Sequence, residues 1–243
     1  MDASTAARLL ELNHAFYEDF GDSFSATRGR LQPGVLRSLE SLRGDESVLD
    51  LGCGNGGLVR ELGRRGHRGR YLGIDSSLPL LHEARRQVPG LPATFLLADL
   101  TQLSLIAGNM PVSDRWSWIA CFAVLHHLPG SELRLEFLRA IHGLVAGQGR
   151  LVLSNWQFLN SPRLRARLQP WEAAGLSQAD VDAGDYLLDW KRNGAGLRYA
   201  HHFSPEELNS LAVQTGFQVI ETFLSDGESG NLGLYQVWTA ASG

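Results

Sequence analysis

The sequence predicts a doubly wound α/β domain, in which helices cover both faces of a mostly parallel sheet. Three observations support this. Short apolar runs alternate with helical segments between Ser47 and Ser154, a glycine-rich turn follows the first of these runs, and two strand-like segments close the chain. The length of 243 residues suits one such domain with modest additions.

The first part of the chain, residues 1–45, is expected to be helical. Apolar residues recur there at helical spacing in two groups, which are Leu9, Leu12 and Phe16, then Val35, Leu36 and Leu39. A polar segment, residues 21–30, lies between the two groups.

Residues 46–155 carry the alternating pattern and form the predicted core. The expected strands are Ser47–Leu51, Tyr71–Ile74, Thr94–Leu97, Trp118–Phe122 and Arg150–Ser154. The expected helices are Leu58–Leu62, Leu78–Val88 and Leu133–Val145. Strands that alternate with helices form a parallel sheet, because each helix provides the crossover between two strands.

The last third of the chain divides into two parts. Residues 156–203 break the rhythm with prolines and tryptophans, and we interpret them as an inserted region on the substrate side of the sheet. In residues 204–243 a capping box from Ser204 to Glu207 begins a helix. The strands Phe217–Leu224 and Leu232–Trp238 follow, and their link is too short for a parallel crossover, so they are expected to be antiparallel. All four parts form one domain.

Composition restricts the classes of function. The net charge of −4 is unlike that of a basic nucleic-acid-binding domain. The two cysteines, Cys53 and Cys121, form no Cys-x-x-Cys pattern, which favours a reducing compartment and argues against a metal site. The N-terminus has no secretory pattern, and no apolar stretch is long enough to span a bilayer, so we expect a cytoplasmic protein without a membrane partner.

The sharpest motif is the turn after the first strand. Gly52, Gly54 and Gly57 satisfy the G-x-G-x-x-G pattern, in which glycines let the backbone approach a ligand closely. Asp50 stands just before the first glycine, where its charge would oppose a bound phosphate. That carboxylate would instead favour the ammonium or sulfonium group of a cationic ligand.

Two more acids follow the next two strands. Asp75 ends the second strand and can accept hydrogen bonds from both hydroxyls of a ribose. Asp99 follows the third strand, where it can accept from an adenine amine while Leu100 flanks the ring; as an alternative, Asp99 caps a helix. The carboxyl ends of adjacent strands are where ligands bind in open α/β sheets, so we favour the ligand role.

In this order, the motifs between Ser47 and Ser154 resemble those of the class I S-adenosylmethionine-dependent methyltransferases, which have a Rossmann-like fold. The resemblance implies a seven-stranded sheet with an antiparallel last strand. It also implies that Asp50 and the turn 52–56, with Cys53 and Asn55, hold the methionine end of the cofactor. Asp75 with Ser76 would hold the ribose, and Asp99 with Leu100 the adenine.

Three further segments are similar to the methyltransferases that esterify 5-carboxymethyluridine at the wobble position of tRNA. They are Ala123–Leu128, Phe24–Arg28 and Arg198–Phe203. The chain departs from that family at Ser117, where an aspartate is common, and in residues 156–189, which have no residue-by-residue match. The resemblance implies tRNA as a partner and, as in its eukaryotic members, a small zinc-binding activator protein.

The same resemblance suggests roles around the acceptor. We expect Ala123 and Arg28 on the cofactor side, and Arg198 on the acceptor side, where a guanidinium can orient a carboxylate. His127 follows the fourth strand and is expected to orient the acceptor, or to act as a base if the acceptor is a hydroxyl or an amine. His201 could flank the acceptor base. A surface or packing role is the alternative for each of these side chains.

Other functions remain open at this level. The same cofactor site could serve a small-molecule O- or N-methyltransferase with an unrelated acceptor pocket. A non-catalytic subunit with this fold is disfavoured, because a scaffold needs none of the acids and glycines of the turn. A nicotinamide-dependent oxidoreductase is disfavoured by Asp50 and by the closing pair of antiparallel strands.

Overall fold

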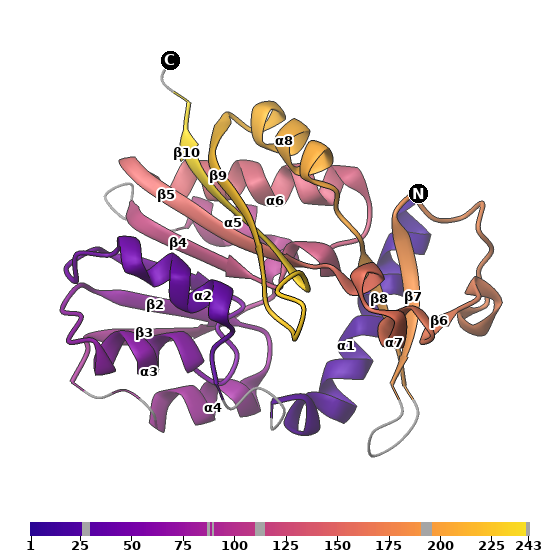
Figure 1. Cartoon of the computed structure of the whole chain (residues 1–243), viewed down its shortest axis with the longest axis horizontal. Helices are drawn as coiled ribbons and strands as arrows, with labels where there is room; N and C mark the ends of the chain where they lie inside the picture. The colour runs from indigo at the N-terminus through magenta and orange to yellow at the C-terminus, as the bar shows by residue number, and fades with distance from the viewer. Residues whose placement is uncertain (26–29, 87, 89, 110–114, 191–195, 242–243) are drawn as a thin grey trace.

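A seven-stranded sheet in the order β3-β2-β1-β4-β5-β10-β9 forms the centre of the computed structural model, which describes residues 1–25, 30–86, 88, 90–109, 115–190 and 196–241 (Figure 1). Its strands are β1 (Val48–Leu51), β2 (Tyr71–Asp75), β3 (Ala93–Leu97), β4 (Trp116–Phe122), β5 (Val145–Trp156), β9 (Phe217–Ser225) and β10 (Gly233–Ala240). Strand β10 runs antiparallel to both of its neighbours, and β1 to β5 pair in parallel. The predicted mostly parallel sheet with an antiparallel last strand is confirmed.

Helices cover both faces of this sheet, as predicted for a doubly wound fold. The helices are α1 (Ala3–Ser25), α2 (Pro33–Ser38), α3 (Gly57–Arg64), α4 (Leu78–Arg86), α5 (Leu103–Gly108), α6 (Ser131–Leu144), α7 (Pro162–Arg165) and α8 (Pro205–Gln214). One apolar core lies under α2 and α3 and contains Val35, Val59 and Trp118. The other lies under α5, α6 and α8 and contains Ile141 and Leu208. Among the described residues, no helix is both long and apolar enough to cross a membrane.

The inserted region forms a second sheet that the sequence pattern did not predict. Strands β6 (Leu168–Gln169), β7 (Asp185–Trp190) and β8 (Gly196–His201) pair antiparallel in the order β6-β7-β8. These strands were not predicted because charged residues such as Asp185 and Arg198 are buried in them, so polar and apolar positions do not alternate. Helix α5 was also not predicted.

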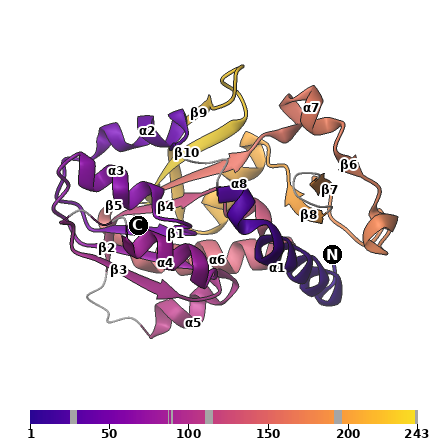
Figure 2. The same cartoon turned by 90° about the horizontal axis from the view of Figure 1, so that it is seen from below.

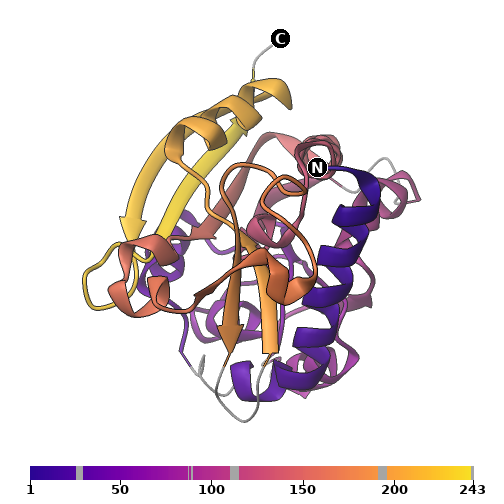
Figure 3. The same cartoon turned by 90° about the vertical axis from the view of Figure 1, so that its right-hand side faces the viewer.

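Helix α1 packs along the inserted sheet rather than against the main one (Figure 2 and Figure 3). Leu9 of α1 is buried with Trp171, Leu187 and Tyr199 in a small core of their own. Figure 1 shows α1 and β8 on the side toward which β4 points, which is the carboxyl edge of the parallel strands. The first and the last quarter of the chain therefore meet in front of that edge.

A buried cluster of charged groups joins the inserted sheet to the main fold. Arg134 of α6 is 2% exposed and donates to Asp185 of β7 at 3.2 Å and to the hydroxyl of Tyr199 at 2.8 Å. His201 of β8 bonds Asp185 through Nδ1 at 2.6 Å and Glu207 of α8 through Nε2 at 2.9 Å. Burial raises the pKa of Asp185, but the hydrogen bonds from His201 and Tyr199 outweigh it and hold that pKa below its ordinary value.

We predict that Asp185→Ala destabilises the protein by about 3–5 kcal/mol, because the buried Arg134 would lose its nearer carboxylate and keep only Glu207, at 3.8 Å. The matched control is Glu221→Ala, which removes an exposed ion pair to Arg37 at 2.7 Å and should cost less than about 1 kcal/mol. Urea unfolding of the two variants measures both effects. Equal losses of unfolding free energy would show that the buried cluster does not hold the inserted sheet.

Candidate functional site

The glycine turn between β1 and α3 is closely packed at Gly52 and open at Gly54. Gly52 and Gly54 have φ angles of +76° and +53°, which favour glycine. A Cβ on Gly52 would lie 2.5 Å from Cγ2 of Val124, whereas a Cβ on Gly54 would meet no atom within 4 Å. The backbone at Gly54 therefore borders free space at the carboxyl edge of the sheet.

Asp75, at the end of β2, holds this turn. Its Oδ2 accepts a hydrogen bond from the amide of Gly54 at 2.8 Å, and its Oδ1 accepts from the amide of Ser77 at 2.9 Å. Burial raises the pKa of Asp75 despite these two bonds. Each carboxylate oxygen has a second lone pair, so the half-buried group can still accept from a ligand hydroxyl. Ser76 beside it is exposed.

Asp50 lies beneath the turn and is 3% exposed. Burial raises its pKa to about 7, although the hydroxyl of Tyr71 donates to it at 2.6 Å and opposes the shift. Cys53 is also buried, and burial together with Asp50 and Asp75 raises the pKa of its thiol. A cation bound next to this group of acids would lower the pKa of Asp50 and be held in return.

Asp99 and Leu100 lie beside the turn, at the end of β3. The Oδ1 of Asp99 accepts from the amide of Thr101 at 2.8 Å and caps a short 3-10 helix, Leu100–Gln102. The helix cap that the sequence analysis gave as the alternative role of Asp99 is thus present. The carboxylate is exposed, and its second oxygen can still accept from a ligand. A Cβ on Gly52 would lie 3.9 Å from Cδ1 of Leu100, so this side chain borders the turn. Adenine binding at Asp99 stays a prediction.

The segment after β4 continues the same edge. Ala123 has a φ of +57°, which is uncommon without glycine, and its amide donates to the backbone oxygen of Ser154 at 3.0 Å. A 3-10 helix, Leu125–His127, follows. The half-buried ring of His127 approaches the hydroxyl of Tyr17 through Nε2 at 2.8 Å and the backbone oxygen of Tyr199 through Nδ1 at 3.3 Å. Tyr17 was not among the predicted site residues, because nothing in the sequence pattern of α1 distinguishes it from a packing residue.

Arg198 and His201 face different surroundings, although both belong to β8. The guanidinium of Arg198 is 4.3 Å from the ring centroid of Trp156 and 5.5 Å from that of Phe16, and the residue is 5% exposed. Trp156 ends β5 at the carboxyl edge and is half-buried. His201 belongs to the buried cluster with Asp185 and Glu207, so carboxylates already occupy both of its ring nitrogens. A direct role of His201 in catalysis stays a prediction.

The structure thus gathers most of the predicted cofactor residues at one edge of the sheet. These residues fit a cationic nucleoside such as S-adenosylmethionine. Gly54 borders free space, Asp75 is placed to accept from ribose hydroxyls, and the buried Asp50 can attract a positive charge. Asn55 is half-buried within the turn. Arg28 lies outside the described residues.

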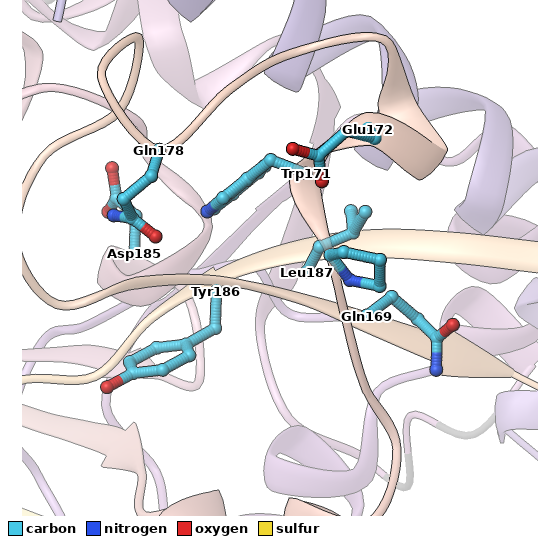
Figure 4. A pocket seen from close by; sticks show the side chains of 8 residues that line it. Gln169, Trp171, Glu172, Gln178, Asp185, Tyr186 and Leu187 are labelled. Carbon is cyan, nitrogen blue, oxygen red and sulfur yellow. The ribbon is translucent and has the colours of Figure 1, made fainter.

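Described residues of α1 and of the inserted region line two cavities. The first, of about 230 Å³, is lined by β7 and the segment before it, and Figure 4 shows Trp171 pointing toward Gln178 and Asp185. The second, of about 750 Å³, lies between α1 and β8 and is bordered by Phe16 and Trp190.

Comparisons with known proteins identify the family. Residues 24–222 match the family described as "Methyltransferase domain". A protein of Schizosaccharomyces pombe named tRNA (carboxymethyluridine(34)-5-O)-methyltransferase is 22% identical over 230 residues, which are 87% of this chain and 90% of that protein. A mouse protein with the same activity in its name is 28% identical over 150 residues, which are 59% of this chain but only 19% of the mouse protein.

A solved structure with the same fold is the 1,6-didemethyltoxoflavin-N1-methyltransferase of Burkholderia thailandensis, with 1,6-didemethyltoxoflavin and S-adenosylhomocysteine bound. The TM-score is 0.67 and the identity 18%, with 100% of this chain and 92% of that chain covered. None of these three proteins gives support for the expected zinc-binding activator.

We predict that Gly54→Ala weakens S-adenosylmethionine binding by at least about tenfold, because the new methyl group would enter the free space at the turn. Gly66→Ala is the matched control, since Gly66 has a φ of +74° and also no atom within 4 Å of a Cβ. Both variants should lose roughly 1 kcal/mol of stability to backbone strain. Titration calorimetry that found the same affinity in both would place the cofactor elsewhere.

The pKa of Asp50 predicts a pH dependence of cofactor binding. Below pH 7 the carboxyl becomes protonated and loses the charge that attracts a cation, so the affinity for S-adenosylmethionine should fall as the pH drops from 8 to 5.5, by at most about tenfold per pH unit. Asp50→Asn should bind more weakly and without this slope. S-adenosylhomocysteine, which lacks the sulfonium charge, should show a smaller slope; a flat profile for the wild type would contradict the prediction.

Proposed function

The chain belongs to the family of S-adenosylmethionine-dependent methyltransferases, and we propose that it esterifies the carboxylate of 5-carboxymethyluridine at the wobble position of tRNA. The names of the relatives from Schizosaccharomyces pombe and mouse support this acceptor. The observation that carries the proposal is the position of Arg198, a buried guanidinium beside Trp156 at the carboxyl edge.

Arg198 and Trp156 suit the two parts of such an acceptor. A guanidinium binds a carboxylate through paired hydrogen bonds, and its charge is strongest where water is excluded. Trp156 is half-buried and can offer part of its ring to a base splayed out of the RNA. Trp171 and Trp190 are buried, so they serve the inserted region as packing residues.

The chemistry asks little of the protein beyond alignment. S-adenosylmethionine supplies an activated methyl group when it is bound. The acceptor carboxylate is ionised near pH 7, so its oxygen forms the new O–C bond as the S–C bond breaks, and no proton moves. Arg198 would orient that oxygen, while α1 and the inserted sheet would shield it from water.

A small-molecule acceptor is the second candidate. The pair formed by Tyr17 and His127 could take a proton from a hydroxyl or an amine, which a carboxylate acceptor would not need. The structurally similar enzyme from Burkholderia thailandensis is named for methylation of a small heterocycle.

The proposal predicts that the protein transfers the tritiated methyl group of S-adenosylmethionine to bulk tRNA, and that mild alkali then releases the label from the RNA. Alkali lability is expected of a methyl ester, whereas a methyl group on nitrogen, carbon or ether oxygen would stay. Absence of label in tRNA, from protein that binds the cofactor, would favour the small-molecule acceptor.

Arg198→Gln provides the matched variant for this assay. It keeps a polar side chain of similar reach but removes the positive charge, so transfer to tRNA should fall by at least about tenfold while the affinity for S-adenosylmethionine is kept. Unchanged transfer would mean that Arg198 does not bind the carboxylate.

A further inference from the structure

Tyr17 reaches the carboxyl edge from a helix that carries none of the predicted site residues. Asn13 and Tyr17 are four residues apart and share one face of α1. The side chain of Asn13 accepts from the amide of Tyr199 at 2.8 Å and donates to the backbone oxygen of His127 at 3.5 Å, which fixes this face against β8 and the 3-10 helix after β4. Leu31, which follows α1 in the sequence, lies beside the glycine turn, because a Cβ on Gly57 would be 3.2 Å from its Cδ2.

The contacts of His127 determine which way the hydroxyl of Tyr17 donates. The backbone oxygen of Tyr199 can only accept, so Nδ1 of His127 carries the proton in the 3.3 Å bond between them. In the neutral ring Nε2 is then an acceptor, and Tyr17 donates its hydroxyl proton to it at 2.8 Å. A tyrosine hydroxyl can accept a hydrogen bond while it donates one, so the hydroxyl of Tyr17 can do both.

This arrangement is anchored in the buried cluster. The hydroxyl of Tyr199 donates to Asp185 at 2.7 Å and accepts from Arg134 at 2.8 Å, while its amide is bound by Asn13. Tyr199 is fully buried, so its backbone oxygen is a fixed point for His127. The Tyr17 hydroxyl is thus preoriented by a chain of hydrogen bonds that begins in the interior.

We propose that Tyr17 contacts the acceptor nucleotide and accepts a hydrogen bond from one of its N–H or O–H groups, with His127 as the positioning residue. This inference rests on the proposed function, since it takes a nucleotide as the acceptor. It gives the acceptor three contacts of different chemistry. Arg198 takes the carboxylate, Trp156 borders the base, and Tyr17 recognises a donor group that is not methylated.

The test uses the full chain, S-adenosylmethionine and an anticodon stem-loop that carries 5-carboxymethyluridine. Tyr17→Phe should raise the KM for the stem-loop by about tenfold, the effect of one lost hydrogen bond, and leave kcat within about twofold. The dissociation constant of S-adenosylmethionine, measured by calorimetry, should not change. Tyr186→Phe, which removes the hydroxyl of another half-buried tyrosine, should leave all three values unchanged.

His127→Asn separates positioning from packing. The asparagine amide can replace the Nδ1 donor to Tyr199 but has nothing in place of Nε2, so KM should rise as in Tyr17→Phe. The double variant should be no worse than either single one, because both remove the same interaction.

An unchanged KM in Tyr17→Phe, additive effects in the double variant, or a loss confined to cofactor affinity would each overturn the role of Tyr17 while the proposed function stands. A wild-type protein that does not methylate the stem-loop would overturn the proposed function and this inference together.

Discussion

The buried contact between Arg134 and Asp185 is the constraint on which the rest of the site depends. A buried ion pair gains little net free energy over apolar packing, because both charges lose their hydration. What it provides here is a fixed geometry, since α6, β7, β8 and α8 each contribute one member, through Arg134, Asp185, His201 and Glu207. The inserted sheet is therefore held at one position relative to the carboxyl edge of the main sheet.

That position explains how two distant parts of the chain can serve one reaction. The residues expected to hold the cofactor lie at the ends of β1, β2 and β3, and their geometry comes from the parallel sheet and the glycine turn. The acceptor residues we propose come from α1, from β8 and from the end of β5. The inserted sheet fixes the first two of these elements relative to the third. Methyl transfer requires the reacting atoms to be aligned to within a fraction of an ångström, so the rigidity of the joint between the two sheets matters as much as either site.

The sequence predicted the main sheet and its glycine turn far better than the inserted sheet. Strand periodicity, the glycines at 52 and 54 and the acids that end the strands are local signals, and the parallel sheet places them together at one edge. The inserted sheet gave no such signal, because Asp185, Arg198 and His201 are polar residues buried within its strands, and they interrupt the alternation of apolar and polar positions. Tyr17 could not be recognised at all, since its neighbour His127 is 110 residues away.

His127 illustrates why residue type alone does not define a role. A histidine after the fourth strand suggests either a base or an orienting group, and the choice depends on what its two nitrogens contact. Here the backbone oxygen of Tyr199 fixes the proton on Nδ1, and Nε2 turns toward Tyr17 rather than toward open space. Any proton that leaves an acceptor toward His127 would have to pass through the tyrosine hydroxyl. For a carboxylate acceptor no proton leaves, so the same pair is free to act in recognition alone.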